Sequence, residues 1–361
     1  MNILLDIAHP AHVHYFRCLI KEMSPAHKFW VITKESQIIS RLLDHYGIQY
    51  QIAGSKGKSL SQKALKQALF TMQAVRLIKE NKIAYAMGVS VTAAQAARLC
   101  GIPSFYFDDD DLNISPLSAI AGTRFAANIL SPEPLSYEKT RNALYYPGYH
   151  ELAYLHPKRF SPDPAILHKY GVNPEEPYFI LRFNAFTAHH DVHHGGMNLA
   201  QKRELVALLE NHGRVFVNTE AQLDPEFERL KMPILPHEMH HFLSFAQMLV
   251  SDSQTMTSEA AVLGVPSFRC NSFVGKISYL EEEEKRYKLT FGFLPRQFNW
   301  MLESIQALLK TPNLRVEWQT RRQRLLEDKI DVTGFWVWFI ENYPKSKDLL
   351  RSKTFTYEKF K

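Results

Sequence analysis

The sequence predicts an α/β protein with two Rossmann-like domains, whose parallel sheets face a central cleft. Three observations lead to this fold class. Strand-like and helix-like segments alternate from residue 2 to residue 130, and the alternation restarts at residue 178 after a stretch rich in Pro, Gly and Tyr. The chain has 361 residues, which exceeds the size at which a single core usually stops growing. Alternating strands and helices form parallel sheets with right-handed crossovers.

The spacing of apolar residues places the elements along the chain. In the first half, strands are expected at 2–7, 27–33, 49–53, 84–87, 104–107 and 128–130, with helices at 14–21, 37–46, 61–81, 92–99 and 117–121. In the second half, strands are expected at 178–183, 214–218, 247–250 and 267–270, with helices at 202–211, 238–245, 259–263, 302–309 and 316–327. The expected domains are 1–150 and 151–330, and an aromatic helix with a basic tail at 331–361 is expected to pack back on the first domain.

Composition excludes several classes of protein. Hydrophobic residues make up 45% and charged residues 22%, as in soluble globular proteins, and no apolar run is long enough to span a membrane. The N-terminus begins directly with a strand pattern and carries no signal-peptide pattern. Three widely spaced cysteines lie among apolar neighbours, which indicates free thiols in a reducing compartment. We therefore expect a cytoplasmic protein.

The net charge of +6 leaves the kind of partner open. Basic residues are not interleaved with aromatic residues along the chain, so we expect no nucleic-acid partner. The basic tail at 345–361 follows an aromatic run at 335–340. This pairing allows a peripheral membrane contact on the inner face, and the alternative is a tail that serves solubility.

The segment 252–266 carries the strongest functional pattern. A polar loop follows an apolar run and leads into a helix that Gly264 and Pro266 close. Such a helix start leaves backbone N–H groups aimed outward, with the helix dipole behind them, and favours a bound phosphate. Glu259 lies about one turn inside, within reach of a sugar hydroxyl. The expected phosphate contacts are the amides of Ser253, Gln254, Thr255 and Met256. The alternative is an ordinary capped helix after a strand.

Three histidines, His9, His12 and His14, follow the first strand at the rim of the predicted sheet. A neutral imidazole there can accept a proton from a hydroxyl nucleophile near physiological pH. His12 lies nearest the helix start and is the expected catalytic residue, with His9 and His14 as competitors or substrate contacts. The alternative is that these histidines cap and pack the first turn.

Four consecutive aspartates, Asp108 to Asp111, follow the strand at 104–107. Adjacent carboxylates repel one another, so some must be neutralised, hydrogen-bonded or left in water. At the end of a strand they can supply a general base, hold acceptor hydroxyls or bind a divalent cation. Asp108 and Asp109 are the better candidates, and the alternative is a solvated loop with one capping aspartate.

Two further loops of the second half offer contacts. Arg182 and Asn184, after the first strand of that half, can bind a phosphate or a sugar. Four histidines and an aspartate at 189–194 could bind a metal, but no partner cluster has zinc-like spacing, so no metal is expected. His237 stands in a turn before a helix, where it can read the edge of a base, unless the turn only starts the helix.

Four spaced motifs together resemble a known family. They are 7–14 (Ile-Ala-His-Pro-Ala-His-Val-His), 148–155 (Gly-Tyr-His-Glu-Leu-Ala-Tyr-Leu), 252–266 and 331–335 (Asp-Val-Thr-Gly-Phe). The family is one of the numbered "domain of unknown function" families of bacteria and archaea, which is predicted to have a GT-B fold and to be glycosyltransferase-like. More distantly, the chain is similar to the peptidoglycan N-acetylglucosaminyltransferase and to non-hydrolysing UDP-N-acetylglucosamine 2-epimerases.

The resemblance implies roles for the candidate residues. In both relatives a loop-helix segment like 253–259 holds the nucleotide diphosphate, with the position of Glu259 on the ribose. In the transferase, a histidine matching His12 lines the acceptor side, although Pro10 and Ala11 here replace the glycines of that loop. The epimerases' set of catalytic carboxylates is not clearly present, although Asp108 and Asp109 lie at a comparable strand end.

The resemblance thus implies a metal-independent, cofactor-free glycosyltransferase for surface polysaccharide or glycolipid. Its partners would be a nucleotide-diphosphate sugar donor, bound by the second domain, and a glycan or lipid-linked acceptor, bound by the first. A sugar-nucleotide epimerase, which needs no acceptor, is the alternative activity. A non-catalytic nucleotide-sugar binding protein is the alternative from another class.

Overall fold

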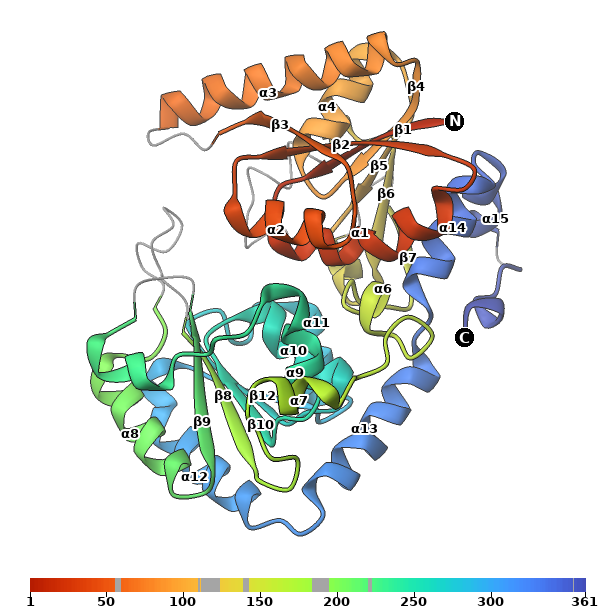
Figure 1. The fold of residues 1–361 in the computed structure, drawn as a ribbon. Coiled ribbons are helices and arrows are strands. Elements are labelled where there is room, and N and C mark those ends of the chain that lie inside the picture. The colour runs from red at the N-terminus through yellow and green to blue at the C-terminus, as the bar shows by residue number, and fades with distance from the viewer. Residues whose placement is uncertain are drawn as a thin grey trace. The chain divides into compact units, whose positions relative to one another are not determined.

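The computed structural model describes residues 1–55, 60–109, 111, 124–138, 143–183, 195–219, 223–352 and 354–361 (Figure 1). The chain forms two compact units. Unit 1 comprises Met1–Arg159 and Lys329–Lys361, and unit 2 comprises Phe160–Asp328. Each unit is built on a parallel sheet with helices packed against it. The predicted fold class, with two Rossmann-like parts, is confirmed.

The described residues of unit 1 form a parallel sheet of seven strands in the order β3-β2-β1-β4-β5-β6-β7. The strands are β1 (Asn2–Ile7), β2 (Lys28–Lys34), β3 (Tyr50–Gly54), β4 (Ile83–Gly88), β5 (Ser104–Phe107), β6 (Asn128–Pro132) and β7 (Ala143–Tyr146). The strand order reverses direction between β1 and β4. Ligands of open parallel sheets bind at the carboxyl ends of strands beside such a switch point. The His9 and His12 loop follows β1 and therefore lies at this edge.

Two groups of helices cover the sheet of unit 1. On one face, α3 (Leu60–Glu80) and α4 (Val91–Cys100) pack through Phe70, Ala74 and Ala93 onto Leu4. The second group is α1 (Pro10–Met23), which packs against α6 (Leu152–Leu155) and α14 (Val332–Glu341). The remaining elements are α2 (Gln37–His45), α15 (Lys345–Arg351) and the 3₁₀ helices η1 (Glu133–Glu138) and η6 (Glu358–Phe360).

Helix α14 brings the C-terminal segment into the core of unit 1. Its Trp336 is fully buried, with its ring 4.6 Å from that of Phe107. Phe335 and Phe339 are also fully buried. Aromatic side chains of this size contribute much of the apolar area that a core buries. Unit 1 is therefore assembled from both ends of the chain.

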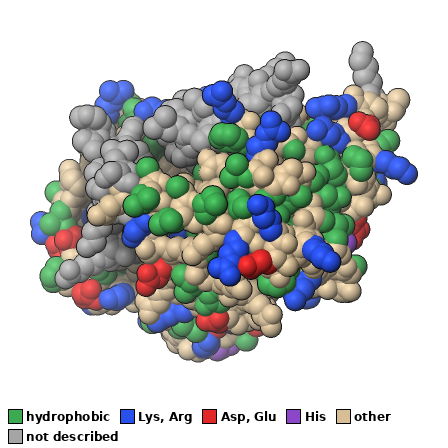
Figure 2. All heavy atoms as spheres, turned by 90° about the horizontal axis from the view of Figure 1, so that it is seen from above, with side chains coloured by type: hydrophobic (Ala, Val, Ile, Leu, Met, Phe, Trp, Pro, Cys, Tyr) green, Lys and Arg blue, Asp and Glu red, His purple; other side chains and the backbone are tan. Residues whose placement is uncertain are grey.

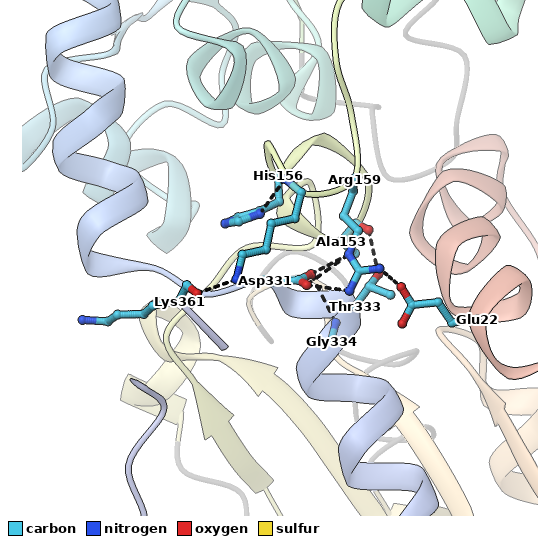
Figure 3. A network of polar contacts seen from close by, with 9 residues as sticks. Glu22, Ala153, His156, Arg159, Asp331, Thr333, Gly334 and Lys361 are labelled. Atoms are coloured by element: carbon cyan, nitrogen blue, oxygen red, sulfur yellow. Dashed lines mark hydrogen bonds and ion pairs between the residues drawn. The ribbon is translucent and has the colours of Figure 1, made fainter. Parts of the chain in front are cut away.

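A polar network fixes the start of α14 (Figure 3). Asp331 caps the helix, with its Oδ1 accepting from the Gly334 N–H at 3.2 Å. Arg159 Nε donates to the same carboxylate at 2.9 Å, and the guanidinium also pairs with Glu22 of α1. Thr333 Oγ1 donates to the Ala153 carbonyl at 2.6 Å. The motif at 331–334 thus joins the two chain segments of unit 1 close to where each leaves it.

The described residues of unit 2 form a parallel sheet of five strands in the order β12-β11-β10-β8-β9. The strands are β8 (Tyr178–Phe183), β9 (Arg214–Thr219), β10 (Met248–Ser251), β11 (Ser267–Cys270) and β12 (Thr290–Phe293). The helices are α7 (Ala165–Lys169), α8 (Leu199–Glu210), α9 (Met239–Leu243), α10 (Gln254–Leu263), α11 (Ser278–Lys285), α12 (Phe298–Leu309) and α13 (Leu314–Asp328), with 3₁₀ helices η3 (Pro225–Leu230), η4 (Pro236–Glu238) and η5 (Pro295–Gln297).

Several elements differ from the sequence prediction. Strands β7 and β12 were not expected, and each is a four-residue strand at the edge of its sheet. Helix α1 begins at Pro10 rather than at residue 14, because His9 caps it and proline is pre-shaped for the first helical position. The helix expected at 117–121 lies outside the described residues. In the described parts of the chain, no helix is both long and apolar enough to cross a bilayer.

Candidate functional site

The start of α10 in unit 2 has the geometry of an anion site. Strand β10 is fully buried and ends at Ser251, and α10 begins at Gln254. Ser253 lies at the capping position of α10, with φ −89° and ψ 139°. Its side chain makes no capping hydrogen bond. A helix start without a side-chain cap leaves its first amides available to a ligand, and the dipole favours a negative one.

Hydrogen bonds within the loop hold this helix start in place. Ser251 Oγ accepts from the Ser253 N–H at 2.7 Å, and Thr257 Oγ1 donates to the Ser253 carbonyl at 2.6 Å. Asn271 Nδ2 donates to the Asp252 carbonyl at 2.8 Å. Ser253, Gln254 and Thr255 are half-buried. Met256 is buried, so only its backbone amide can serve a ligand there.

Arg182 lies at the same edge of the sheet, at the carboxyl end of β8. It is paired in register with Ser251 on one side and with Asn218 on the other. The Asp252 N–H donates to the Arg182 carbonyl at 3.2 Å, and the Arg182 guanidinium bonds to the Asn218 side chain. The Arg182 backbone is thereby joined to the loop before α10, whereas its guanidinium is held on the β9 side of β8, at the same carboxyl edge of the sheet.

Glu259, one turn into α10, is buried against a histidine of α9. Its Oε1 lies 2.9 Å from Nε2 of His240, and the two side chains are only 6% and 4% exposed. Sequence reasoning did not select His240, because no local pattern separates it from its neighbour His241. The contact orients the Glu259 carboxylate.

His237 and Asn184, the two other predicted site residues of unit 2, add little to the geometry of the anion site. His237 lies in η4, is half-buried, and has its Nε2 3.9 Å from Glu238 Oε1. It stands three residues before His240, on the segment that leads into α9. Asn184 and the histidines at 189–194 lie outside the described residues. Within the described part of the chain, no group of three His, Cys, Asp or Glu side chains could hold a metal ion.

In unit 1, the structure brings His12 and Asp109 together. His12 Nε2 lies 3.8 Å from Asp109 Oδ2, and the two side chains are 9% and 25% exposed. Burial, followed by the charges of His9 and His150, lowers the pKa of His12 well below 6.5. His12 is therefore neutral at physiological pH.

The hydrogen bonds of His12 fix which ring nitrogen carries the proton. Its Nδ1 accepts from the Ala8 N–H at 3.3 Å, so in the neutral ring the proton lies on Nε2, the atom that faces Asp109. With this tautomer the Nε2–H faces Asp109 Oδ2 across 3.8 Å, a distance longer than a hydrogen bond. The more exposed Asp109 carboxylate is then better placed than His12 to accept a proton from a substrate hydroxyl.

The other two histidines of this loop have structural contacts. His9 caps α1, with its Nδ1 accepting from the Ala11 N–H at 3.2 Å. The ring of His14 is buried and stacks on Tyr154 with 5.4 Å between ring centres. These contacts match the capping and packing alternative for His9 and His14 and do not test a substrate contact by either.

Further polar groups gather around the His12–Asp109 pair. Asp108 Oδ2 accepts from Ser131 Oγ at 3.1 Å. Burial raises the pKa of Tyr146 well above 10, and the nearby charges of Asp108, Glu151 and Asp109 raise it further. The ring of His150 stacks on Tyr15 at 4.8 Å, and burial lowers its pKa to about 3. In the sequence, residues 148–155 stand out only as a motif, and the structure places His150 and Glu151 beside the candidate site.

Solved structures of nucleotide-sugar proteins share this fold. S. aureus MnaA with UDP is 13% identical with a TM-score of 0.66, and 97% of each chain is covered. Neisseria meningitidis UDP-GlcNAc 2-epimerase bound to UDP-GlcNAc is 12% identical with a TM-score of 0.64, covering 91% of this chain and 99% of that one. The glycosyltransferase VinC in complex with DTDP is 13% identical with a TM-score of 0.62, covering 94% and 99%.

At such identities the likeness shows the fold, and the predicted resemblance to GT-B glycosyltransferases and UDP-N-acetylglucosamine 2-epimerases is confirmed at that level. A relative by sequence is "Uncharacterized protein MJ0665" of Methanocaldococcus jannaschii. It is 25% identical over 308 residues, which cover 79% of this chain and 86% of the relative. Residues 1–290 match the family described as "Protein of unknown function (DUF354)", and the chain belongs to that family.

Proposed function

We propose that this protein is a glycosyltransferase that uses a nucleotide-diphosphate sugar to build surface polysaccharide or glycolipid. The single observation that supports it best is the uncapped start of α10, which follows a buried parallel strand, with Glu259 one turn inside the helix and the Arg182 backbone bonded to the preceding loop. Similar structures whose titles name UDP, UDP-GlcNAc or DTDP share the fold.

The donor would bind to unit 2. The amides of 254–256 would hold the diphosphate, and Arg182 would add positive charge as the diphosphate leaves. Glu259, oriented by His240, would accept hydrogen bonds from the ribose hydroxyls. His237 would contact the base from the turn before α9.

The acceptor would bind to unit 1, as a glycan or a lipid-linked sugar. Asp109 would take the proton from the attacking hydroxyl, and neutral His12 would donate its Nε2–H to the Asp109 carboxylate and hold it in place. Asp108, oriented by Ser131, would bind a neighbouring hydroxyl. Positioned groups of this kind contribute about 10²- to 10⁴-fold in rate.

The donor site can be tested by removing one amide proton. Ser253 has the extended backbone that a residue before proline requires, and residue 254 is the first of the helix, where proline is tolerated. Gln254→Pro should therefore keep the fold and lose one charge-assisted hydrogen bond to the diphosphate. We expect UDP binding, measured by calorimetry, to weaken about 10- to 100-fold.

Gln254→Ala is the matched control, because it removes the same side chain and keeps the amide. Its affinity for UDP should stay within a few-fold of the wild type. Equal affinities for the proline and alanine variants would show that the start of α10 does not hold the diphosphate. Glu259→Ala should weaken the binding of UDP more than that of inorganic pyrophosphate, which has no ribose.

Transfer must also be separated from epimerisation, because 2-epimerases share this fold. Incubation with UDP-sugars alone should give no C2 epimer, and sugar should move only when an acceptor is added. An epimer formed without acceptor would assign the alternative activity. Tight nucleotide binding without either product would favour the non-catalytic alternative.

A further inference from the structure

Helix α3 of unit 1 has apolar side chains on two opposite faces. Its inner face packs on the sheet through Phe70, Ala74 and Ile78, which are at most 3% exposed. Its outer face carries three large apolar side chains at the spacing of one helical stripe, namely Leu65, Leu69 and Met72, which are 62%, 57% and 58% exposed. A surface helix normally has charged and polar residues on its outer face, so this second stripe requires an explanation.

Two neighbouring elements carry further exposed apolar side chains close to α3. Ile52 of β3 is 55% exposed and lies on the same side of the strand as Gly54, which packs against the Phe70 ring. Leu99 of α4 is 65% exposed and stands beside Cys100, whose thiol lies 3.9 Å from the Val75 carbonyl of α3. We call Ile52, Leu65, Leu69, Met72 and Leu99 the α3 patch.

The chain around the α3 patch is strongly basic. Between Asp44 and Asp108 the sequence holds eight Lys and Arg residues and a single acidic residue, Glu80. This segment therefore carries +7, whereas the whole chain carries +6, so the rest of the chain is close to neutral. Among the described residues, Arg76, Lys79, Lys82 and Arg98 of this segment are exposed. Figure 2, which looks onto the α3 side, shows hydrophobic side chains with Lys and Arg around them.

We propose that the α3 patch docks the protein on the surface of an anionic lipid bilayer. Exposed apolar side chains on a helix, bordered by charges of one sign, are the combination by which amphipathic helices bind membrane interfaces. The cations attract the anionic headgroups of such a surface. The occupant is a bilayer and not a protein partner because the segment around the patch holds eight cations against one carboxylate, Glu80, which pairs with Arg76.

The basic tail, which also suggested a membrane contact, is less suited to that role. The aromatic residues before it are turned inward, since Phe335, Trp336 and Phe339 are fully buried in unit 1. Lys359 lies 3.7 Å from the ring centre of Trp338, so its charge rests on the protein's own aromatic surface. The membrane contact is therefore assigned to α3 and not to the C-terminus.

The position of α3 also fits a lipid-linked acceptor, and this step rests on the proposed function. Lys66 Nζ donates to Ser55 Oγ at 2.8 Å, and Gln67 Oε1 accepts from Lys34 Nζ at 3.0 Å. Ser55 follows β3 and Lys34 ends β2, so the first half of α3 lies at the carboxyl edge of the sheet. His12 and Asp109 occupy that same edge. A docked α3 would bring this edge close to the headgroups.

The test is co-sedimentation of the full chain with vesicles made of phosphatidylglycerol and phosphatidylcholine in equal parts. We expect binding that weakens as salt is added and is lost on vesicles of phosphatidylcholine alone. Leu65→Gln/Leu69→Gln/Met72→Gln should weaken it at least about 100-fold. Lys79→Gln/Lys82→Gln should weaken it about 30-fold, because both cations are exposed.

The matched control is Trp300→Gln/Val316→Gln, which removes two equally exposed apolar side chains from unit 2, 61% and 66% exposed. It should bind vesicles like the wild type. Unchanged thermal midpoints and UDP affinity would show that each variant is folded, and they separate this test from that of the donor site. Wild-type protein that ignores anionic vesicles would overturn the proposal. A triple variant that still binds anionic vesicles would also overturn it. So would a triple variant whose only change is that a dimer becomes a monomer on size exclusion, since the patch would then be an interface between copies of this chain.

Discussion

At the scale of single residues, the structure brings the side chains of His12 and Asp109 together, with 3.8 Å between Nε2 and Oδ2. The sequence suggested a histidine base, because an imidazole at a strand end suits proton transfer near neutral pH. The structure adds the hydrogen bond from the Ala8 N–H to Nδ1, which places the ring proton on Nε2 and directs it at Asp109. We infer that His12 positions the carboxylate and that Asp109 moves the proton.

This division of roles predicts different results for three variants. Asp109→Asn cannot accept the proton and should lower kcat by at least about 100-fold, with little change in UDP affinity. His12→Gln keeps an N–H donor near the position of Nε2, whereas His12→Ala keeps none. Steady-state kinetics should therefore show higher kcat for His12→Gln than for His12→Ala. Equal, complete loss in both His12 variants, with an active Asp109→Asn, would return the base role to His12.

At the scale of elements, Asp331 gives the 331–335 motif a structural role. Its carboxylate caps α14 and binds Arg159, which lies at the end of the first chain segment. Arg159 also pairs with Glu22 of α1, so the Arg159 side chain joins the start of α14 to α1. The Asp331 side chain is 7% exposed and that of Arg159 is 16% exposed. Bonds of this kind are costly to break because the partner cation stays largely buried.

Asp331→Ala should lower the free energy of unfolding by about 3 kcal/mol, since it removes a helix cap and leaves Arg159 without its main partner. Urea denaturation gives the measurement. Arg203→Ala breaks a bidentate pair with Glu226 on the surface of unit 2 and is the control, with little or no change expected. A loss for Asp331→Ala no larger than that of the control would mean that the network does not stabilise unit 1.

The alternation of strands and helices could be predicted because buried parallel strands such as 248–251 are short apolar runs followed by helices. Strands β7 and β12 could not be predicted, since each is only partly buried and exists through pairing along one edge. The α10 start was visible as a local pattern. The bond between Glu259 and His240 was not, because it joins residues 19 positions apart through tertiary packing.

At the scale of the whole molecule, unit 2 is one continuous segment and unit 1 is not. All the residues proposed for the donor site lie in unit 2. The two chain segments that connect it to unit 1 are held together, with Arg159 Nε 2.9 Å from Asp331 Oδ1. The ends of unit 2 are therefore close in space, as expected for a domain inserted into another.

This arrangement predicts that Phe160–Asp328, expressed alone, folds and binds UDP. Unfolding should be a single cooperative transition, and the affinity measured by calorimetry should lie within a few-fold of that of the full chain. Gln254→Pro in the same fragment is the negative control. A fragment that unfolds without a cooperative transition would show that unit 2 depends on unit 1 for its stability.

The contribution of α14 to unit 1 has a consequence for how the protein is made. A ribosome releases Met1–Arg159 first, but this segment lacks Trp336 and the two buried phenylalanines that fill its core. Domains usually fold in the order of synthesis. Here unit 2 can fold as soon as it is synthesised, whereas unit 1 can complete its core only after the 33 residues Lys329–Lys361 have emerged. A nascent chain stalled just before Lys329 should therefore carry a folded unit 2 and a unit 1 that proteases still cut.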